Sequence, residues 1–223
     1  ALAAVVGEIE ARDGEAMFVV ADATDGASVE RALDTLKQRY GGLDILVNNV
    51  GGASKMAGFW DLDDADWLDS YDLNVMGAVR FTRLAVPLLR ESKAPRIINV
   101  TSISALQPGT YNPHYAAAKA ALLNLSKYLS NSLVEDGILV NSICPGPVYS
   151  DSWDRNVERL AVERGITVDD SRQAVDREEA AKIPLKRIGE GRDVAGLVVF
   201  LASDEASWIT GSCYHVDGGK YRS

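Results

Sequence analysis

The stretch 96-RIINVTSISALQPGTYNPHYAAAKAALLN-124 decides the fold. Its β-branched start, 97–100, predicts a buried strand, and the Gly/Pro/Asn-rich loop at 108–113 breaks regular structure. An Ala-rich helix is expected from about His114. The stretch therefore predicts a strand, a loop and a helix, with polar residues gathered where the strand ends.

Tyr115 and Lys119 are four residues apart in this helix, so phenol and ammonium are expected on one face. A neighbouring cation lowers a tyrosine pKa, and a tyrosine shifted towards neutrality can act as a general acid or base. Ser102 follows the strand, where its hydroxyl could meet the phenol over one substrate oxygen. A lone Y-x-x-x-K is a weak signal, but the serine at the strand end favours a functional interpretation.

The rest of the chain alternates helices with strands. Helical spacing is found at 1–11, 28–40, 70–90 and 192–203, and apolar strand-like runs at 16–21, 43–47, 138–143 and 210–216. This alternation predicts an α/β fold whose parallel sheet carries helices on both faces. Ligands of such sheets bind at the carboxyl ends of the strands.

Two further polar features lie in this frame. Asn48-Asn49-Val50-Gly51 follows the strand at 43–47. Asn74 is an amide on the apolar face of the helix at 70–90, where an unpaired side chain is costly to bury. Alone it would be structural; beside Ser102, Tyr115 and Lys119 it is a functional candidate.

Length and charge limit the classes of function. The chain has 223 residues, which suits one domain over 1–223, and a formal net charge of −9. That charge argues against nucleic acid or an anionic membrane as a main partner. No apolar run is long enough to span a bilayer, and the start has no basic region typical of a signal peptide.

The four potential soft metal ligands are scattered in sequence. Cys144 and Cys213 lie in apolar runs, so both are predicted to be buried, inert thiols of a cytosolic protein. His114 and His215 are isolated and are interpreted as structural or solvent-exposed. The sequence thus predicts no metal site.

Residues from about 151 to 182 are highly charged and predict two short helices inserted near a strand end. Such an insertion can be a mobile cap over a substrate. Its Trp153, Arg155, Arg159 and Arg164 offer apolar and cationic groups. A surface hairpin without ligand contact is nearly as good an interpretation.

With these residues in place, the chain resembles the short-chain dehydrogenase/reductase family, in its oxoacyl-carrier-protein-reductase-like branch. The resemblance implies a Rossmann-like doubly wound parallel sheet. The matching motifs, in family order, are Asp22, Asn48-Asn49-Val50-Gly51, Asn74, Ser102, Tyr115 with Lys119, Pro145-Gly146, and the tail from Ile183 to Gly219. Valine replaces the usual alanine at position 50, and Ser150 replaces the more frequent threonine.

The resemblance implies interconversion of a secondary alcohol and a ketone with NAD or NADP, by hydride transfer. Tyr115 would exchange the proton, Lys119 would stabilise the phenolate and hold the nicotinamide ribose, Ser102 would bind the substrate oxygen, and Asn74 would anchor a relay water. The implied cofactor-binding residues are Asp22, Ala23, Asn48, Val50, Gly51, Tyr115, Lys119, Pro145, Gly146, Val148 and Ser150. A small-molecule substrate, a cytoplasmic location and a homo-oligomer, dimer or tetramer, are implied as well.

One departure concerns the start. The family begins with a strand, a T-G-x-x-x-G-x-G turn, a helix and a second strand before the segment that matches Ala1, and the printed sequence contains none of them. That turn holds the pyrophosphate, and the absent first strand would lie beside 43–47, leaving an apolar edge. Three hypotheses follow: an oxidoreductase printed without its N-terminus, a non-catalytic protein of this fold acting through interfaces, or an enzyme with reorganised nucleotide binding. Substrate, direction and the choice between NAD and NADP stay open.

Overall fold

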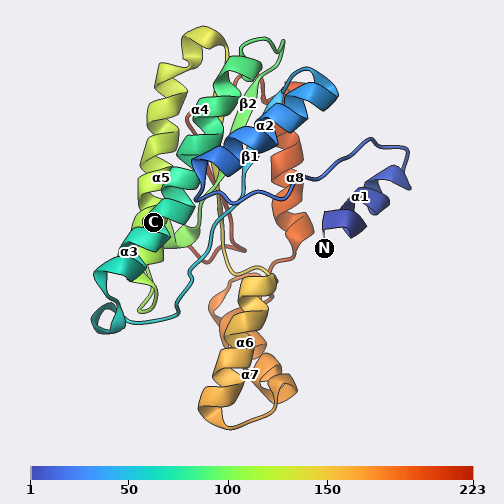
Figure 1. Cartoon of the computed structure of the whole chain (residues 1–223). Coiled ribbons are helices and arrows are strands. Elements are labelled where there is room, and N and C mark those ends of the chain that lie inside the picture. The colour runs from blue at the N-terminus through green and yellow to red at the C-terminus, as the bar shows by residue number, and fades with distance from the viewer. Residues whose placement is uncertain (1, 223) are drawn as a thin grey trace.

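Four parallel strands form one sheet in the computed structural model, which describes residues 2–222 (Figure 1). They lie in the order β1-β2-β3-β4. Their bounds are β1 Ile45–Asn48, β2 Arg96–Val100, β3 Leu139–Pro145 and β4 Cys213–Val216. Asn48 pairs with Asn99, Val100 with Ile143, and Pro145 with Val216, so the carboxyl ends of the strands share one edge.

The helices surround this sheet and its carboxyl edge. Their bounds are α1 Leu2–Glu10, α2 Gly26–Tyr40, α3 Asp64–Tyr71, α4 Gly77–Leu89, α5 Pro113–Ser132, α6 Asp151–Arg164, α7 Val168–Lys182 and α8 Gly191–Ala202. Short 3-10 helices lie at Phe59–Asp61, Ile103–Ala105, Val134–Asp136 and Asp204–Ala206. The predicted α/β architecture is confirmed.

Alternate residues of β2 supply two hydrophobic cores. Ile97 packs with Ala85 and Leu89 of α4 and with partly buried residues of α2 and α5. Ile98, next along the strand, packs with Leu201 of α8 on the opposite face. Because successive side chains of a strand point to opposite faces, one apolar strand holds helices on both sides of the sheet.

The helix predicted over 70–90 is interrupted. A π-helical segment, Asp72–Met76, lies between α3 and α4. Asn74 falls inside it, and its amide donates to the carbonyl oxygen of Ser70 at 2.8 Å. A π-bulge changes the direction in which its side chains point, and such bulges are frequent at functional sites.

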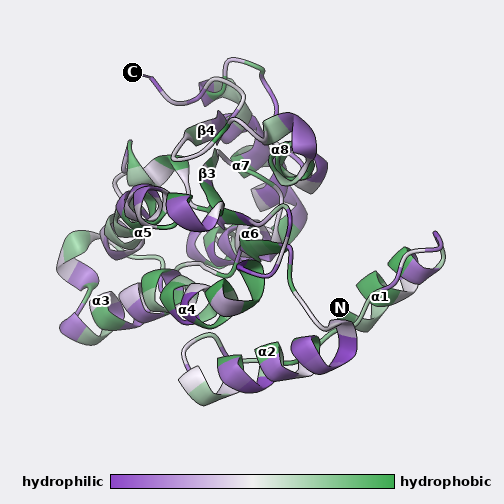
Figure 2. Cartoon of the chain, turned by 90° about the horizontal axis from the view of Figure 1, so that it is seen from above, coloured by the Kyte–Doolittle hydropathy of each residue, from purple (hydrophilic) through white to green (hydrophobic). Residues whose placement is uncertain are grey.

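Residues 16–21 form no strand, which corrects the prediction. A strand requires a hydrogen-bonded neighbour, and within 2–222 this segment pairs with none. Phe18 and Val20 are consequently exposed, and β1 forms the sheet's edge with Ile45 and Val47 partly exposed. Helix α1 forms as predicted but buries no residue, and it lies away from the body in both views (Figures 1 and 2).

Helices α6 and α7 form the hairpin predicted at 151–182, and it projects below the body in Figure 1. Asp176 of α7 holds its base, accepting from the Tyr149 hydroxyl and from Trp153 Nε1, both at 3.0 Å. Arg159 and Arg164 are paired with Glu163 and Glu178. Among residues 2–222, no helix combines the length and apolar character needed to cross a membrane.

Candidate functional site

The carboxyl edge of the sheet brings Ser102 and Lys119 close to one another. Ser102 follows the end of β2, where the preceding Thr101 donates its backbone N–H to Ile143 of β3 at 2.7 Å. Lys119 reaches back from α5, and its Nζ donates to the carbonyl oxygen of Val100 at 2.9 Å. Strand and helix are therefore joined through the lysine ammonium itself.

Lys119 is almost fully buried, with 3% of its surface exposed. Burial lowers its pKa to about 8, because the charged ammonium loses water; the nearby Cys144 thiolate opposes this shift. The lysine Nζ lies 5.8 Å from the centre of the Tyr115 ring. The predicted proximity of phenol and ammonium is thus present.

The predicted direction of the Tyr115 pKa is wrong for this structure. Burial raises it, and the hydrogen bond with Ser102 only partly opposes that effect. The lysine is bonded to Val100 instead and does not set the phenol's pKa. Ser102 Oγ accepts from Ser104 N at 3.2 Å and from Ser104 Oγ at 2.8 Å. Its own hydroxyl proton is thus left to be donated, to Tyr115 or to a ligand oxygen.

Asn74 is fully buried and tied to the loop after β1. Its Nδ2 donates to the carbonyl oxygen of Gly52 at 2.9 Å, and its Oδ1 accepts from Gly52 N at 3.0 Å. A Cβ on Gly51 would lie 2.6 Å from Asn74 Oδ1 and 2.7 Å from Lys119 Nζ. The residue at 51 must therefore be glycine for Asn74 and Lys119 to approach from either side.

Asn48 takes part in a buried polar ladder rather than facing the open edge. Its Nδ2 donates to Asn99 Oδ1 at 2.8 Å, and Asn99 Nδ2 donates to Ser126 Oγ at 2.7 Å. The side chain of Asn48 also reaches Thr82 Oγ1 at 3.2 Å. The ladder therefore links β1, β2, α4 and α5. Val50, two residues after Asn48, is exposed.

The turn after β3 forms another wall. Gly146 N donates to Val216 O at 3.0 Å, and a Cβ on Gly146 would lie 2.8 Å from the Asp217 Cα, which only glycine avoids. The following Val148 bridges to Gly189 and lines a cavity of about 550 Å³. Ser150 caps α6, accepting from Trp153 N at 3.3 Å.

Asp22 and Ala23 lie beside the Asn74 end of the site. The Asp22 carboxylate accepts from Thr24 N at 2.8 Å and Thr24 Oγ1 at 2.7 Å, which lowers its pKa. Thr24 lines a cavity of about 290 Å³ together with Gly52 and Ser70. The Ala23 carbonyl oxygen accepts from Arg80 at 3.0 Å.

Asn112, whose positioning role sequence reasoning missed, fixes the start of α5. Asn112 adopts φ 58° and joins the β1–α3 loop, donating its N–H to Ala57 O at 2.8 Å and accepting from Ala57 N at 3.1 Å. An asparagine between a turn and a helix was the available signal, because asparagine tolerates the left-handed region. His114 is buried with both ring nitrogens unpaired, and burial lowers its pKa.

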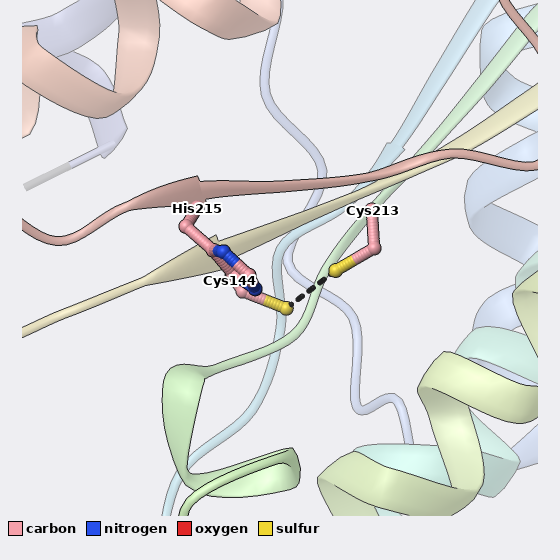
Figure 3. Close-up of side chains that lie close together, drawn as sticks. All are labelled: Cys144, Cys213 and His215. Carbon is pink, nitrogen blue, oxygen red and sulfur yellow. Dashed lines mark hydrogen bonds between the residues drawn. The ribbon is translucent and has the colours of Figure 1, made fainter. Parts of the chain in front are cut away.

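The fold brings together three of the four potential metal ligands, Cys144, Cys213 and His215. Cys144 is buried as predicted, but Cys213 is exposed, which corrects the prediction of two buried thiols. The two sulfur atoms are 3.0 Å apart, and the structure brings His215 to the same place (Figure 3). The cluster arises from the pairing of β3 with β4, which sequence spacing does not reveal.

Comparison with known proteins finds relatives that match nearly the whole chain. The profile of the family described as Enoyl-(Acyl carrier protein) reductase matches residues 1–220. A 3-oxoacyl-[acyl-carrier-protein] reductase FabG of Staphylococcus epidermidis is 33% identical over 98% of this chain and 83% of its own length. The FabG protein of Salmonella typhimurium is 33% identical over 89% of this chain and 75% of its own.

Solved structures of other reductases also resemble the chain over its whole length. L-sorbose reductase from Gluconobacter frateurii, in complex with NADPH and L-sorbose, superposes with a TM-score of 0.90 at 32% identity. The superposition covers 100% of this chain and 83% of that one. An NADH-dependent reductase, A1-R′, responsible for alginate metabolism, has a TM-score of 0.84 at 27% identity, covering 100% of this chain and 83% of its own.

Proposed function

Because the chain belongs to the short-chain dehydrogenase/reductase family, we propose that it interconverts a secondary alcohol and a ketone with NAD or NADP, using Asn74, Ser102, Tyr115 and Lys119. One observation carries this assignment of residues. A partly buried phenol is hydrogen-bonded with the Ser102 hydroxyl, and its ring centre lies 5.8 Å from a buried lysine ammonium, at the carboxyl edge of the sheet. A merely structural tyrosine has no need of either neighbour.

The chemistry of the chain's own residues follows from this arrangement. In reduction, Ser102 donates a hydrogen bond to the carbonyl oxygen and stabilises the charge that develops there. Tyr115 then gives its phenolic proton to that oxygen, as a general acid. Lys119 stabilises the phenolate that remains, once it turns from the Val100 carbonyl. In oxidation of the alcohol, each proton moves in the opposite direction.

We propose that the nicotinamide cofactor binds along this edge. Gly51 and Gly146 let the loops after β1 and β3 pack against Asn74, Lys119 and Asp217, and Val148 lines a cavity of about 550 Å³ beyond β3. We assign ribose contacts to Tyr115 and Lys119, and further contacts to Asp22, Ala23, the backbone of Asn48, Val50, Gly51, Pro145, Gly146, Val148 and Ser150. When bound, the nicotinamide supplies or accepts the hydride.

The proposed role of Asn74 is positional. Its amide already holds the Gly52 backbone by two hydrogen bonds and contacts Ser70, so little of its capacity is free to anchor a relay water. It would act by fixing the loop after β1 against Lys119. Asn74→Asp replaces the N–H donors by a buried carboxylate that faces the carbonyl oxygens of Gly52 and Ser70, so we expect both kcat and the melting temperature to fall.

We place one domain over residues 1–223, with 151–182 as a substrate cap within it. The cap is joined to the site by Ser150 and Tyr149, and Asp176 fixes its base. The relatives' names give two ketone classes, a 3-oxoacyl thioester on a carrier protein and the ketose L-sorbose. Both carry the ketone that Ser102 and Tyr115 would bind, so both classes are candidates for this chain.

We also propose a homo-oligomer, dimer or tetramer, in the cytoplasm. Val199, Phe200 and Trp208 are exposed apolar residues in and just after α8, with 69%, 41% and 99% of their surfaces exposed. A second copy covering them would remove this apolar surface from water. The two free thiols fit a reducing compartment. Light scattering measures the mass, and Trp208→Ser should lower it.

The decisive experiment measures NADH and NADPH oxidation by this chain with a panel of 3-oxoacyl thioesters and ketoses. Tyr115→Phe should abolish turnover, since it removes only the transferable proton. Tyr128→Phe is the matched control, because Tyr128 lies on the same helix and is exposed. Cofactor binding without turnover above the Tyr115→Phe level on the whole panel would favour the non-catalytic alternative.

A further inference from the structure

Three soft side chains, Cys144, Cys213 and His215, converge on the outer end of the sheet. Cys144 lies on β3 opposite His215 on β4, and Cys213 is two residues before His215, so the three share one face. One ligand atom from each lies within 4.8 Å of the others (Figure 3). We propose that these residues bind a thiophilic divalent cation of the zinc type.

The ligand set and its spacing fit such an ion. Zinc takes sulfur at about 2.3 Å and imidazole nitrogen at about 2.0 Å in tetrahedral geometry, which places two thiolates about 3.8 Å apart. The sulfur atoms here are 3.0 Å apart, so modest side-chain rotation admits the ion. Three protein ligands leave a fourth position for water or a small anion.

The alternative use of two adjacent thiols, a disulfide, fits less well. Cys213 on β4 pairs with Ser142 on β3, and Cys144 lies two residues after Ser142. With neighbouring strands about 4.8 Å apart and about 3.3 Å per residue, the two Cα atoms are about 8 Å apart. Disulfides rarely span Cα atoms more than about 7 Å apart without backbone movement, whereas a metal ion bridges longer separations.

Contacts and access favour the same occupant. Thr101 Oγ1 contacts the Cys144 sulfur at 2.8 Å and holds it in place. Cys213 and His215 line a cavity of about 430 Å³ with Ser142 and Ser212, which opens a path for the ion.

The binding step balances simply. The cation replaces the thiol protons of Cys144 and Cys213, while neutral His215 donates a lone pair, so up to two protons are released per ion bound. Nothing is oxidised or reduced. The bound ion would fix the outer strand β4 to β3, next to the Pro145-Gly146 turn that walls the proposed active site.

The test uses Cd²⁺ as a probe with the full, reduced chain, following the ultraviolet charge-transfer band of cadmium thiolates. The chain has only two cysteines, so the band reports on this pair. We expect one Cd²⁺ per chain and competition by Zn²⁺. Cys213→Ser should roughly halve the band, and His215→Gln should keep it but weaken binding at least about tenfold.

Ser212→Ala is the matched control, because it changes a hydroxyl in the same strand region outside the ligand set. It should bind Cd²⁺ as the unaltered chain does. Melting curves of each variant without metal show whether it is folded. A folded, reduced chain without the band would overturn the proposal, as would His215→Gln binding with unchanged affinity. Loss of two hydrogen masses in air, with no metal bound by the reduced chain, would assign a disulfide and also overturn it.

Discussion

Burial of the Lys119 ammonium should make the stability of the fold depend on pH in a defined window. Its pKa falls from 10.5 to about 8 in the folded chain. Each tenfold change in an acid constant is worth about 1.4 kcal/mol, so the penalty on the charged form is about 3 kcal/mol. Because the side chain is almost fully buried, little of this is screened by water.

The sign follows from proton counting. Below about pH 8 the lysine is protonated in both folded and unfolded chains, and the fold carries the whole penalty. Between about pH 8 and 10.5 the unfolded chain holds more protons than the folded one, so the free energy of unfolding rises with pH. Above that window the penalty is gone.

The perturbation is Lys119→Met, which keeps most of the volume and removes the charge. The difference in unfolding free energy between variant and unaltered chain should shift by about 3 kcal/mol between pH 7 and 10.5, in favour of the unaltered chain as pH rises. Contributions that do not titrate, such as packing, cancel in this shift. The lost hydrogen bond to Val100 and nearby groups such as Cys144 add smaller changes.

Urea unfolding, followed by tryptophan fluorescence at fixed chain concentration, gives these differences at each pH. Lys127→Met is the control, because it removes an exposed ammonium from the same helix. A Lys119→Met difference that does not change from pH 7 to 10.5 would refute the burial argument. The same variant should lose turnover, since the phenolate of Tyr115 would have no cation to stabilise it.

Three other substitutions test separate contacts. Gly146→Ala should destabilise the chain by about 1–3 kcal/mol, because its Cβ would meet the Asp217 backbone at 2.8 Å, whereas Gly109→Ala has open space and should not; thermal melting measures both. Asn99→Ala should cost about 2–3 kcal/mol by leaving Asn48 and Ser126 without their buried partner, with exposed Asn124→Ala as control in urea unfolding. Asp176→Ala removes the hydrogen-bond acceptor of Tyr149 and Trp153, so the α6–α7 hairpin should be cut faster in limited proteolysis. In steady-state kinetics, KM should rise by a larger factor than kcat falls.

Local pattern predicted the strands that pair with a neighbour among the described residues. The β-branched run at 97–100 became β2, and the apolar runs at 138–143 and 210–216 became β3 and β4 with shifted ends. The same reasoning failed at 16–21, which has equal strand character but no hydrogen-bonded neighbour among the described residues. A strand forms only beside a second strand that shares its backbone hydrogen bonds, so the sequence of one segment does not suffice to predict it.

The proximity of the candidate residues was predictable in part, and their energetics less so. Spacing placed Tyr115 beside Lys119, because residues four apart in a helix share a face, and their catalytic role stays a prediction. Spacing did not predict the direction of the Tyr115 pKa shift, because burial raises that pKa and the lysine ammonium is held by the Val100 carbonyl oxygen. The Cys144–Cys213–His215 cluster was invisible for another reason: its members meet only through the register of two strands.

Three residues that depart from local preference lie near one another at one edge of this fold. Asn74 lies in a π-helical segment, Asn112 holds a left-handed backbone before α5, and Lys119 is a charge buried against a carbonyl oxygen. Each is unfavourable by itself, and together they cost the fold several kcal/mol, on the order of 1–3 each. We interpret their grouping around Tyr115 as pre-organisation for the proposed proton transfer, because a lysine kept partly desolvated binds a phenolate more strongly than a hydrated one would.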